Sequence, residues 1–320
     1  MKNSHVRALL LCLIPPLIWG GMFPIAAVLE PTVNMFAMTL IRYSVVALIL
    51  AVMLQRAEGT AAFRLEGQGW RLFLLGSAGF AGFGLLAFTA LTYTSAANVS
   101  LIMAMMPAIG AVIAAAATKK LPPVYTIVAI LIAFFGVSLV LTKGDYTHLI
   151  SARDSLGELL ALLGAICWVV YTRGAASVPA WSTLRYTTLT TILGCPTIAI
   201  ATIVATLTGF VTPPSLPAII AGWPELSYLI VLAGVVAVLF WNQGNKMLGP
   251  INGTLFMNLV PITTYSIVTI TTGVLPTTAA VAGALCVIAG LLVNNVWSRR
   301  AGAKARKNSR EEAESSQPVR

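Results

Sequence analysis

Long apolar stretches, separated by short polar segments, follow one another along almost the whole chain. A helix needs about 20 mostly apolar residues to cross the hydrocarbon core of a bilayer. Ten stretches meet this requirement, at residues 7–28, 35–54, 71–92, 97–117, 122–142, 156–176, 183–208, 226–246, 251–272 and 277–297. The sequence therefore predicts an all-α integral membrane protein with ten transmembrane helices.

The composition points to lipid as the solvent of this chain. Of its 320 residues, 58% are hydrophobic and 9% are charged, whereas a soluble domain carries about a quarter of its residues as charged side chains. The net charge of +10 raises the question of nucleic acid as a partner. The basic residues, however, lie between the apolar stretches and in the tail, and form no continuous face for phosphates. We therefore expect no nucleic-acid partner.

Lysine and arginine residues set the expected orientation, because they favour the cytoplasmic side of a membrane. With the N-terminus inside, nearly all of the 20 basic residues fall on the cytoplasmic side. Lys143 and Arg153 fall on the opposite side, and Arg42 lies within a span. Both termini are therefore predicted to be cytoplasmic, in an inner membrane of bacterial type. The first apolar stretch continues to about Leu29 and more spans follow, which favours a span over a signal peptide.

The two halves of the chain resemble each other. Matching residues recur in the same order, as the pairs Trp19 and Trp168, Arg42 and Arg185, Tyr43 and Tyr186, Asn98 and Asn252, Met103 and Met257, and Pro107 and Pro261. Each half holds five spans, an odd number, so the second half must enter the membrane from the opposite side. The sequence predicts two inverted five-helix repeats, at 1–143 and 144–298, followed by a polar tail at 299–320 that is predicted to be disordered.

Prolines interrupt several of the predicted spans. Pro15, Pro16 and Gly20 lie in the first span, which is expected to bend or hinge beside a pathway. Pro107 and Pro261 lie near the middle of the fourth and ninth spans, where each proline leaves a backbone carbonyl without its helical partner. Such breaks either expose backbone dipoles to a substrate or serve as packing kinks, and both interpretations stay open.

Arg42 is the most informative charge in the sequence. It lies about two turns inside the second span, where a cation is costly and faces a partner or an aqueous cavity. No Asp or Glu lies deep in any predicted span. Backbone carbonyls or an anionic substrate are therefore the expected partners of Arg42, and the alternative is that the side chain reaches toward the nearer membrane surface.

Aromatic and amide side chains complete the predicted substrate site. Hydrogen bonds between helices and packing in the core are the alternative roles for these residues. Together with Arg42, the candidates for substrate binding are Trp19, Tyr43, Phe88, Asn98, Met103, Trp168, Tyr171, Trp241, Asn242, Asn252 and Asn258.

These features resemble the drug/metabolite transporter superfamily, and in particular its ten-helix, EamA-type branch. The resemblance rests on two five-span halves, Trp19-Gly20 in the first helix, Arg42 in the second, and Pro107 and Pro261 in the fourth and ninth. It implies a secondary transporter, often an exporter of metabolites or amino acids, with a central cavity between the halves and peripheral fifth and tenth helices.

The small four-helix multidrug members of that superfamily exchange protons for cationic drugs through a Glu inside the membrane. In this sequence Glu158 lies near the end of a span, and Glu30 and Glu225 lie in loops. This departure argues against proton-coupled efflux of cations.

The sequence also bears on two other classes of function. An intramembrane enzyme needs a catalytic base or metal ligands, but His5 and His148 lie outside the spans and no Asp lies within one. A channel shares the symmetry of a carrier and stays an alternative. We expect a small-molecule substrate, the lipid bilayer as surroundings, and neither a cofactor nor a metal. The sequence leaves the coupling ion and the oligomeric state open.

Overall fold

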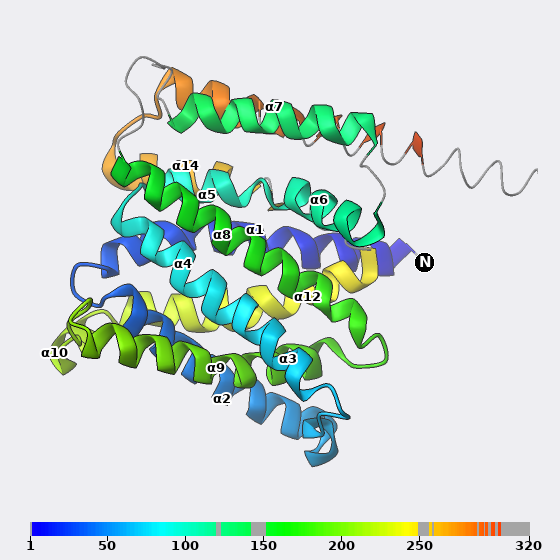
Figure 1. Ribbon diagram of the computed structural model, residues 1–320, viewed down its shortest axis with the longest axis vertical. Helices are drawn as coiled ribbons and strands as arrows, with labels where there is room; N and C mark the ends of the chain where they lie inside the picture. The colour runs from blue at the N-terminus through cyan, green and yellow to red at the C-terminus, as the bar shows by residue number, and fades with distance from the viewer. Residues whose placement is uncertain are drawn as a thin grey trace, which may run out of the picture.

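The computed structural model describes residues 2–119, 123–141, 152–248, 256–257, 259–286, 288–290, 292–293, 296–297 and 300–301. Within these ranges all regular secondary structure is helical, and no strand occurs. The helices run roughly side by side in a bundle, with the N-terminus at one end and α10 (Leu216–Ala221) at the other (Figure 1). The expectation of an all-α protein is therefore met throughout the described residues.

Seven of the helical segments are long and apolar enough to cross a membrane. They coincide with the first four predicted spans and with the sixth, seventh and eighth. The elements that form them are α1 (Lys2–Leu29), α2 (Met35–Glu58), α3 (Gly69–Gly76) with η2 (Ser77–Gly82), α4 (Phe83–Thr89) and η3 (Ala90–Thr92), α5 (Ala96–Met103) with α6 (Met106–Thr118), α8 (Ala152–Gly174) with η4 (Ala175–Ser177), α9 (Thr183–Leu207), and α11 (Trp223–Ser227) with η5 (Tyr228–Val236) and α12 (Ala237–Leu248).

The other three predicted spans correspond to shorter helical segments. The fifth is α7 (Val124–Leu141), which carries no charged residue. The ninth contains α14 (Leu259–Thr272), and the tenth contains an apolar helix at Thr278–Gly290. A short 3₁₀ helix, η1 (Thr60–Phe63), follows α2. The count of ten spans therefore stays a prediction, as does the disorder of the tail at 299–320, of which only residues 300 and 301 are described, as helix.

The elements pack in a pattern that is unchanged when the two halves of the chain are exchanged. Near the middle of this pattern, α2 packs against α9. Several other contacts come in equivalent pairs: α1 packs against α12 as α8 packs against α4, α1 against α14 as α8 against α6, and α2 against η5 as α9 against η2. Both η2 and η5 are π-helical segments within the third and eighth spans.

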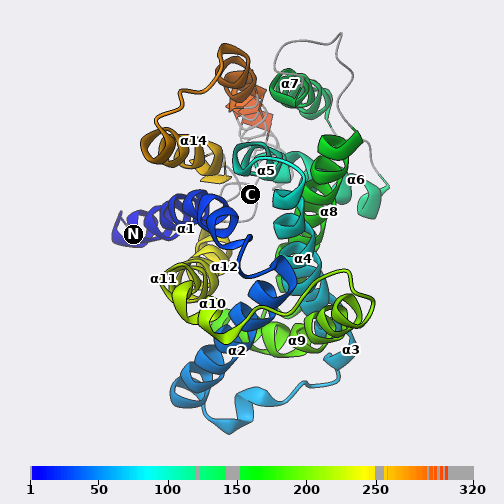
Figure 2. The same ribbon diagram turned by 90° about the vertical axis from the view of Figure 1, so that its left-hand side faces the viewer.

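The view along the bundle shows α7 at one edge, beside the helix that follows α14 in the sequence, and α2 and α9 toward the opposite edge (Figure 2). Elements α1, α4, α5, α8 and α12 lie between them. This arrangement places the predicted fifth helix at the periphery and the residues of the first, third, fourth, sixth and eighth spans around the interior.

The prolines in the first span do not interrupt it. The structure shows α1 as one continuous α-helix with Pro15, Pro16 and Pro24 inside it, and the bend or hinge expected from the sequence stays a prediction. A proline lacks the N–H that would bond the carbonyl four residues before it. For Pro24 that carbonyl belongs to Gly20, and the hydroxyl of Thr264 on α14 donates to it at 2.8 Å. The same hydroxyl lies 2.9 Å from the carbonyl of Val260 in its own helix, so its hydrogen is shared between the two carbonyls. A neighbouring helix thus supplies the missing donor and allows α1 to continue.

Close approaches of backbone bring α3 against α9. A Cβ atom added to Gly76 would lie 2.0 Å from the carbonyl oxygen of Thr190, and one added to Gly194 would lie 2.6 Å from the carbonyl oxygen of Gly76. Small residues allow helices to pack at such short distances inside a membrane. These two glycines fix the position of the third span against the seventh.

Candidate functional site

Three tryptophans from three spans meet in the interior of the bundle. The ring of Trp19 on α1 lies 5.5 Å from the ring of Trp168 on α8 and 5.5 Å from the ring of Trp241 on α12, measured between centroids, and both pairs meet edge to face. The indole N–H of Trp19 donates to the carbonyl of Ala233 in η5 at 3.1 Å. The structure thus brings together three residues that the sequence predicts for one site.

Arg42 is buried beside these rings. Its side chain is 1% exposed, so it does not extend to the surface as the alternative interpretation of the sequence required. The guanidinium carbon lies 4.8 Å from the centre of the Tyr43 ring and 5.3 Å from that of Phe88. Its Nη2 atom donates to the sulfur of Met22 at 3.4 Å.

The charge of Arg42 is incompletely satisfied by the part of the chain that the structure describes. Its Nε and Nη1 atoms are buried and have no hydrogen-bond partner there. The sulfur of Met22 is a weak acceptor, and the aromatic rings offer attraction to a cation without a hydrogen bond along an N–H direction. Arg42 therefore presents unused donors inside the bundle.

A small cavity lies between Arg42 and the tryptophans, and we call it the central cavity. Its free volume is about 10 Å³, enough for about one water molecule. Helices from both halves of the chain contribute to its wall, which is formed by Trp19, Met22, Phe23, Arg42, Tyr43, Phe83, Met103, Met106, Trp168, Val238, Met257 and Val260. Five of the predicted substrate-binding residues, Trp19, Arg42, Tyr43, Met103 and Trp168, are in this wall.

The polar residues on α8, α9 and α12 bond to one another. The side-chain amide nitrogen of Asn242 donates to the hydroxyls of Tyr171 and Thr187, both at 3.0 Å. Tyr186 donates to the carbonyl of Tyr171 at 2.7 Å, and the two rings are stacked. Bonds between helices therefore account for the amide nitrogen of Asn242, which is the alternative role the sequence allowed. Asn242 also lines a pocket of about 340 Å³ near the junction of α8 and α9.

Of the remaining predicted amides, Asn98 is the one that the structure describes, and it is not in the wall of the central cavity. Asn98 lies in the first turns of α5, where its side chain donates to the hydroxyl of Thr94 at 3.0 Å. Asn252 and Asn258 lie outside the described residues. Phe88 is not in the cavity wall, but its ring contacts the wall residue Phe23 at 6.4 Å between centroids.

The predicted breaks at prolines lie beside the cavity. The fourth span is broken at Ala104 and Met105, and Pro107 lies in the first turn of α6, where a missing N–H costs nothing. Pro261 lies in the first turn of α14 and is buried. Gly20 lies against α14, where an added Cβ would be 2.4 Å from the Cβ of Thr263.

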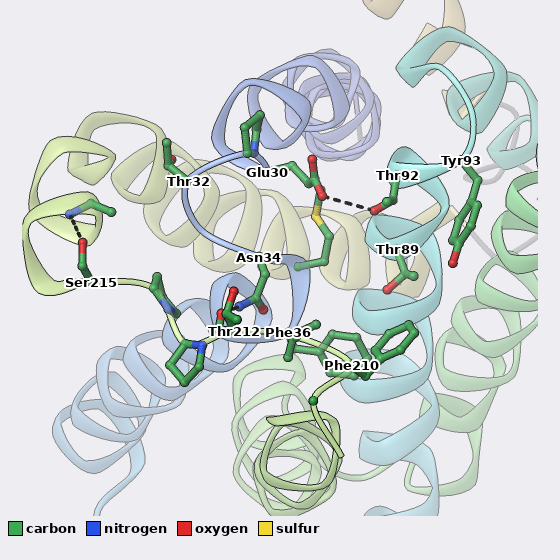
Figure 3. A pocket seen from close by; sticks show the side chains of 17 residues that line it. Glu30, Thr32, Asn34, Phe36, Thr89, Thr92, Tyr93, Phe210, Thr212 and Ser215 are labelled. Atoms are coloured by element: carbon green, nitrogen blue, oxygen red, sulfur yellow. Dashed lines mark hydrogen bonds between the residues drawn. The ribbon is translucent and has the colours of Figure 1, made fainter. Parts of the chain in front are cut away.

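A larger pocket, which we call the loop pocket, lies at the end of the bundle where α1 leads into α2 (Figure 3). Its free volume is about 590 Å³. Most of its wall is formed by residues 30–32, 34–36 and 209–215, together with Thr89, Thr92 and Tyr93. Asn34 donates to the carbonyl of Thr212 at 2.7 Å across it, and Thr92 donates to Glu30 at 3.4 Å. The sequence analysis missed this pocket, because loop residues carry no helical periodicity.

At the opposite end of α2, charged and aromatic residues join the two halves of the chain. Arg185 pairs with Glu66 at 2.6 Å and lies 3.9 Å above the ring of Trp181, whose N–H donates to Glu66 at 2.9 Å. The hydrogen bonds from Arg185 and then Trp181 lower the pKa of the Glu66 carboxyl from its ordinary value. Lys246 donates to the carbonyl of Trp181 at 2.9 Å. We call Glu66, Trp181, Arg185 and Lys246 the latch.

Metal chemistry finds no ready site in the described residues, since no three His, Cys, Asp or Glu side chains there gather closely enough to hold an ion. The chemistry that the central cavity offers is recognition. It combines a buried cation, aromatic faces and adaptable methionines, which together suit a small molecule that is partly apolar and partly charged.

Comparison with known proteins adds a family. The sequence profile of the EamA-like transporter family matches residues 6–142 and again residues 155–296. A Bacillus subtilis protein named as the uncharacterized transporter YrdR is 38% identical over 303 residues, which cover 93% of this chain and 94% of the relative. The uncharacterized transporter YyaM of the same organism is 33% identical over 254 residues, which cover 78% of this chain and 81% of the relative.

A known crystal structure has a similar fold. It superimposes with a TM-score of 0.66 over 92% of this chain and 98% of the other chain, at 17% sequence identity. At that identity the likeness concerns the fold alone.

Proposed function

The chain belongs to the EamA-like transporter family, and from this premise we propose that it is a secondary transporter that exports small metabolites such as amino acids across the inner membrane. Transport proceeds by alternating access through the central cavity, which lies between two inverted repeats at 1–143 and 144–298. Both termini are cytoplasmic. The lipid bilayer is its surroundings, and a small molecule is its cargo.

The observation that carries this proposal is the narrow central cavity beside two larger pockets. The central cavity holds about 10 Å³, the loop pocket about 590 Å³ and the pocket near the junction of α8 and α9 about 340 Å³. A constriction lined from both halves, with wider space toward either end of the bundle, fits a carrier that opens to one side at a time. An open channel requires a continuous passage.

The exchange of equivalent contacts between the halves supports the same mechanism. Two inverted halves with the same packing are related by a pseudo-two-fold axis in the membrane plane. A small shift of one half against the other can therefore convert a state open to one side into the equivalent state open to the other side. The π-helical segments η2 and η5 lie in equivalent spans, and such segments occur frequently at functional sites. They place adaptable backbone beside α9 and α2, where the halves meet.

Efflux of cationic drugs is the second candidate, because the aromatic wall would attract a cation. The described wall of the central cavity, however, carries the positive charge of Arg42 and no carboxylate. Arg42 therefore makes the cavity unfavourable for cations, and we favour a metabolite carrier.

Isotope counterflow in liposomes tests the proposal. The purified protein is reconstituted, loaded with an unlabelled amino acid from a panel, and given a trace of the same labelled compound outside, with and without a proton gradient. A carrier accumulates label transiently and saturates, whereas a channel only equilibrates it. Protein-free liposomes are the control. Equilibration without overshoot for every transported compound would favour the channel, and a dependence on the gradient would identify protons as the coupling ion.

A further inference from the structure

We propose that Arg42 and the indole N–H of Trp168 form an anion subsite in the central cavity that binds the carboxylate of the transported molecule. The inference rests on the proposed transport function and specifies its substrate class, namely small carboxylates with an apolar body. The inference is supported by the polar atoms in the cavity wall that have no hydrogen-bond partner. In this proposal the carboxylate is the group that the protein recognises.

The central cavity leaves one kind of polar atom unused. Among the described residues of its wall, the buried side-chain atoms without a hydrogen-bond partner are Nε and Nη1 of Arg42 and Nε1 of Trp168. All three are donors. A cavity that leaves only donors unpaired is complementary to an acceptor, and a carboxylate offers two oxygens with about four acceptor positions.

The charge of Arg42 lacks a counter-ion among the described residues. Arg42 is 1% exposed, and the ion pair within these residues is that between Arg185 and Glu66 at the end of the bundle. A buried cation without a counter-ion is strongly unfavourable. A ligand that arrives with a negative charge removes this penalty, so the site selects for anions.

The geometry of the Arg42 guanidinium suits a carboxylate, because a guanidinium binds a carboxylate best through two parallel N–H groups. The end edge of Arg42 is formed by Nη1 and Nη2, and its side edge by Nε and Nη2, so each edge contains one unpartnered nitrogen. Nη2 is engaged at 3.4 Å by the thioether of Met22, a weak acceptor that a carboxylate oxygen readily displaces.

An apolar part of the cavity wall suits the apolar body of the transported molecule. This part surrounds the charged group and is formed by Phe23, Phe83, Met103, Met106 and Met257. Methionine side chains change shape easily, which allows a cavity of about 10 Å³ to widen around an apolar body. A short aliphatic or aromatic carboxylate satisfies both parts of the site, whereas a cation or a fully polar sugar satisfies neither.

A pair of ligands that differ only in charge tests the inference. The protein in lipid nanodiscs is titrated with 4-methylpentanoate or with the uncharged 4-methylpentanamide at neutral pH, and binding is followed by tryptophan fluorescence and by the shift in thermal unfolding. The pair of leucine and leucinamide repeats the comparison with an ammonium present. We expect each acid to bind at least about tenfold more tightly than its amide, since hydrogen bonds between ionised groups are stronger than those to a neutral amide.

Variants locate the preference. Arg42→Gln should abolish the preference for the acid, Arg42→Lys should keep part of it, and Trp168→Phe should weaken acid binding more than amide binding. Arg56→Gln, an exposed arginine in the last turn of the same helix, is the matched control and should keep the full preference. Comparable unfolding temperatures without ligand show that the variants are folded.

Binding and transport are read separately, so the two proposals can fail independently. Equal binding of acid and amide by the unaltered protein, a preference that persists in Arg42→Gln, or no binding of either acid would overturn the anion subsite. If the protein shows counterflow but transports acids no better than their amides, the anion subsite is overturned and the proposal of a carrier is kept. Acid binding that depends on Arg42 without counterflow of any compound would keep the subsite and remove the carrier.

Discussion

The hydroxyl of Thr264 bonds to the carbonyl of Gly20 at 2.8 Å, and the helix α1 continues past Pro24 at this point. Pro24 has no N–H to give to Gly20, so the bond from α14 replaces one that the helix itself lacks. The same contact holds the first span against the ninth. The hydroxyl of Thr264 thus has two roles: it satisfies a backbone carbonyl of α1, and it holds α14 against α1.

Thr264→Val removes this hydroxyl while keeping the shape of the side chain. The carbonyl of Gly20 then stays buried without a donor, so we expect a loss of about 1 kcal/mol in the free energy of unfolding. Unfolding in mixed micelles measures it. The control is Thr271→Val, because Thr271 is exposed and bonds only within its own helix. Equal stability of both variants would contradict a special role for Thr264.

Gly76→Ala tests the close approach of α3 to α9. The new Cβ would lie 2.0 Å from the carbonyl oxygen of Thr190, so the helices must separate, and overpacking of this kind costs about 1–3 kcal/mol. The same measurement applies. Gly110→Ala is the control, because the nearest atom to its added Cβ is 3.8 Å away and alanine favours a helix. A variant at Gly76 as stable as that at Gly110 would refute the contact.

Much of the interior could be predicted from the sequence. The length of the apolar stretches and the internal repeat are signals summed over many residues, so they do not depend on the conformation of any single one. The matching of Trp19 with Trp168 predicted a shared site, and the two rings meet at 5.5 Å. Arg42 was expected to face a partner or a cavity because a charge inside a span is rare, and it lines the central cavity.

Other features depend on helix rotation and loop conformation, which periodicity does not specify. Asn242 bonds Tyr171 and Thr187, and the π-helical turns of η5 that precede it change the direction of every later side chain in its span. Asn98 lies near the N-terminal end of α5. The loop pocket is built by residues around Pro213, for which no pattern in the sequence indicated a site.

The latch should respond to pH. Because the pKa of Glu66 is lower in this arrangement than its ordinary value of 4.5, the ionised carboxylate is favoured by folding, and its contribution is present above that value and disappears as the pH falls through the lowered pKa. Glu66→Gln should therefore lower the unfolding temperature slightly at pH 7, by about 1–2 °C for an exposed pair. At acid pH the difference should vanish.

Thermal unfolding of both proteins across the pH range measures this effect. Glu225→Gln, in the first turn of α11, removes the same charge away from the latch and is the control. A difference at Glu66 that stays constant down to acid pH would show that the ion pair with Arg185 is not its source.

We expect the paired rings of Phe23 and Phe88 to separate the central cavity from the loop pocket. Phe23 is in the wall of the central cavity, and Phe88 precedes Thr89, which lines the loop pocket. Their contact at 6.4 Å contributes about 0.5–1.5 kcal/mol to closure. Phe88→Ala should therefore raise water access to the cavity by up to about tenfold.

A reporter cysteine measures this access. Met103→Cys, in a background where the four native cysteines are replaced, places a thiol in the cavity wall, and its rate of reaction with a charged methanethiosulfonate reagent is recorded. Phe36→Ala is the matched control, because Phe36 pairs with Phe210 at 5.9 Å in the wall of the loop pocket. If both variants label at the unaltered rate, the two rings do not close the path. If only Phe88→Ala accelerates labelling, the barrier lies between the two pockets, where alternating access requires a gate.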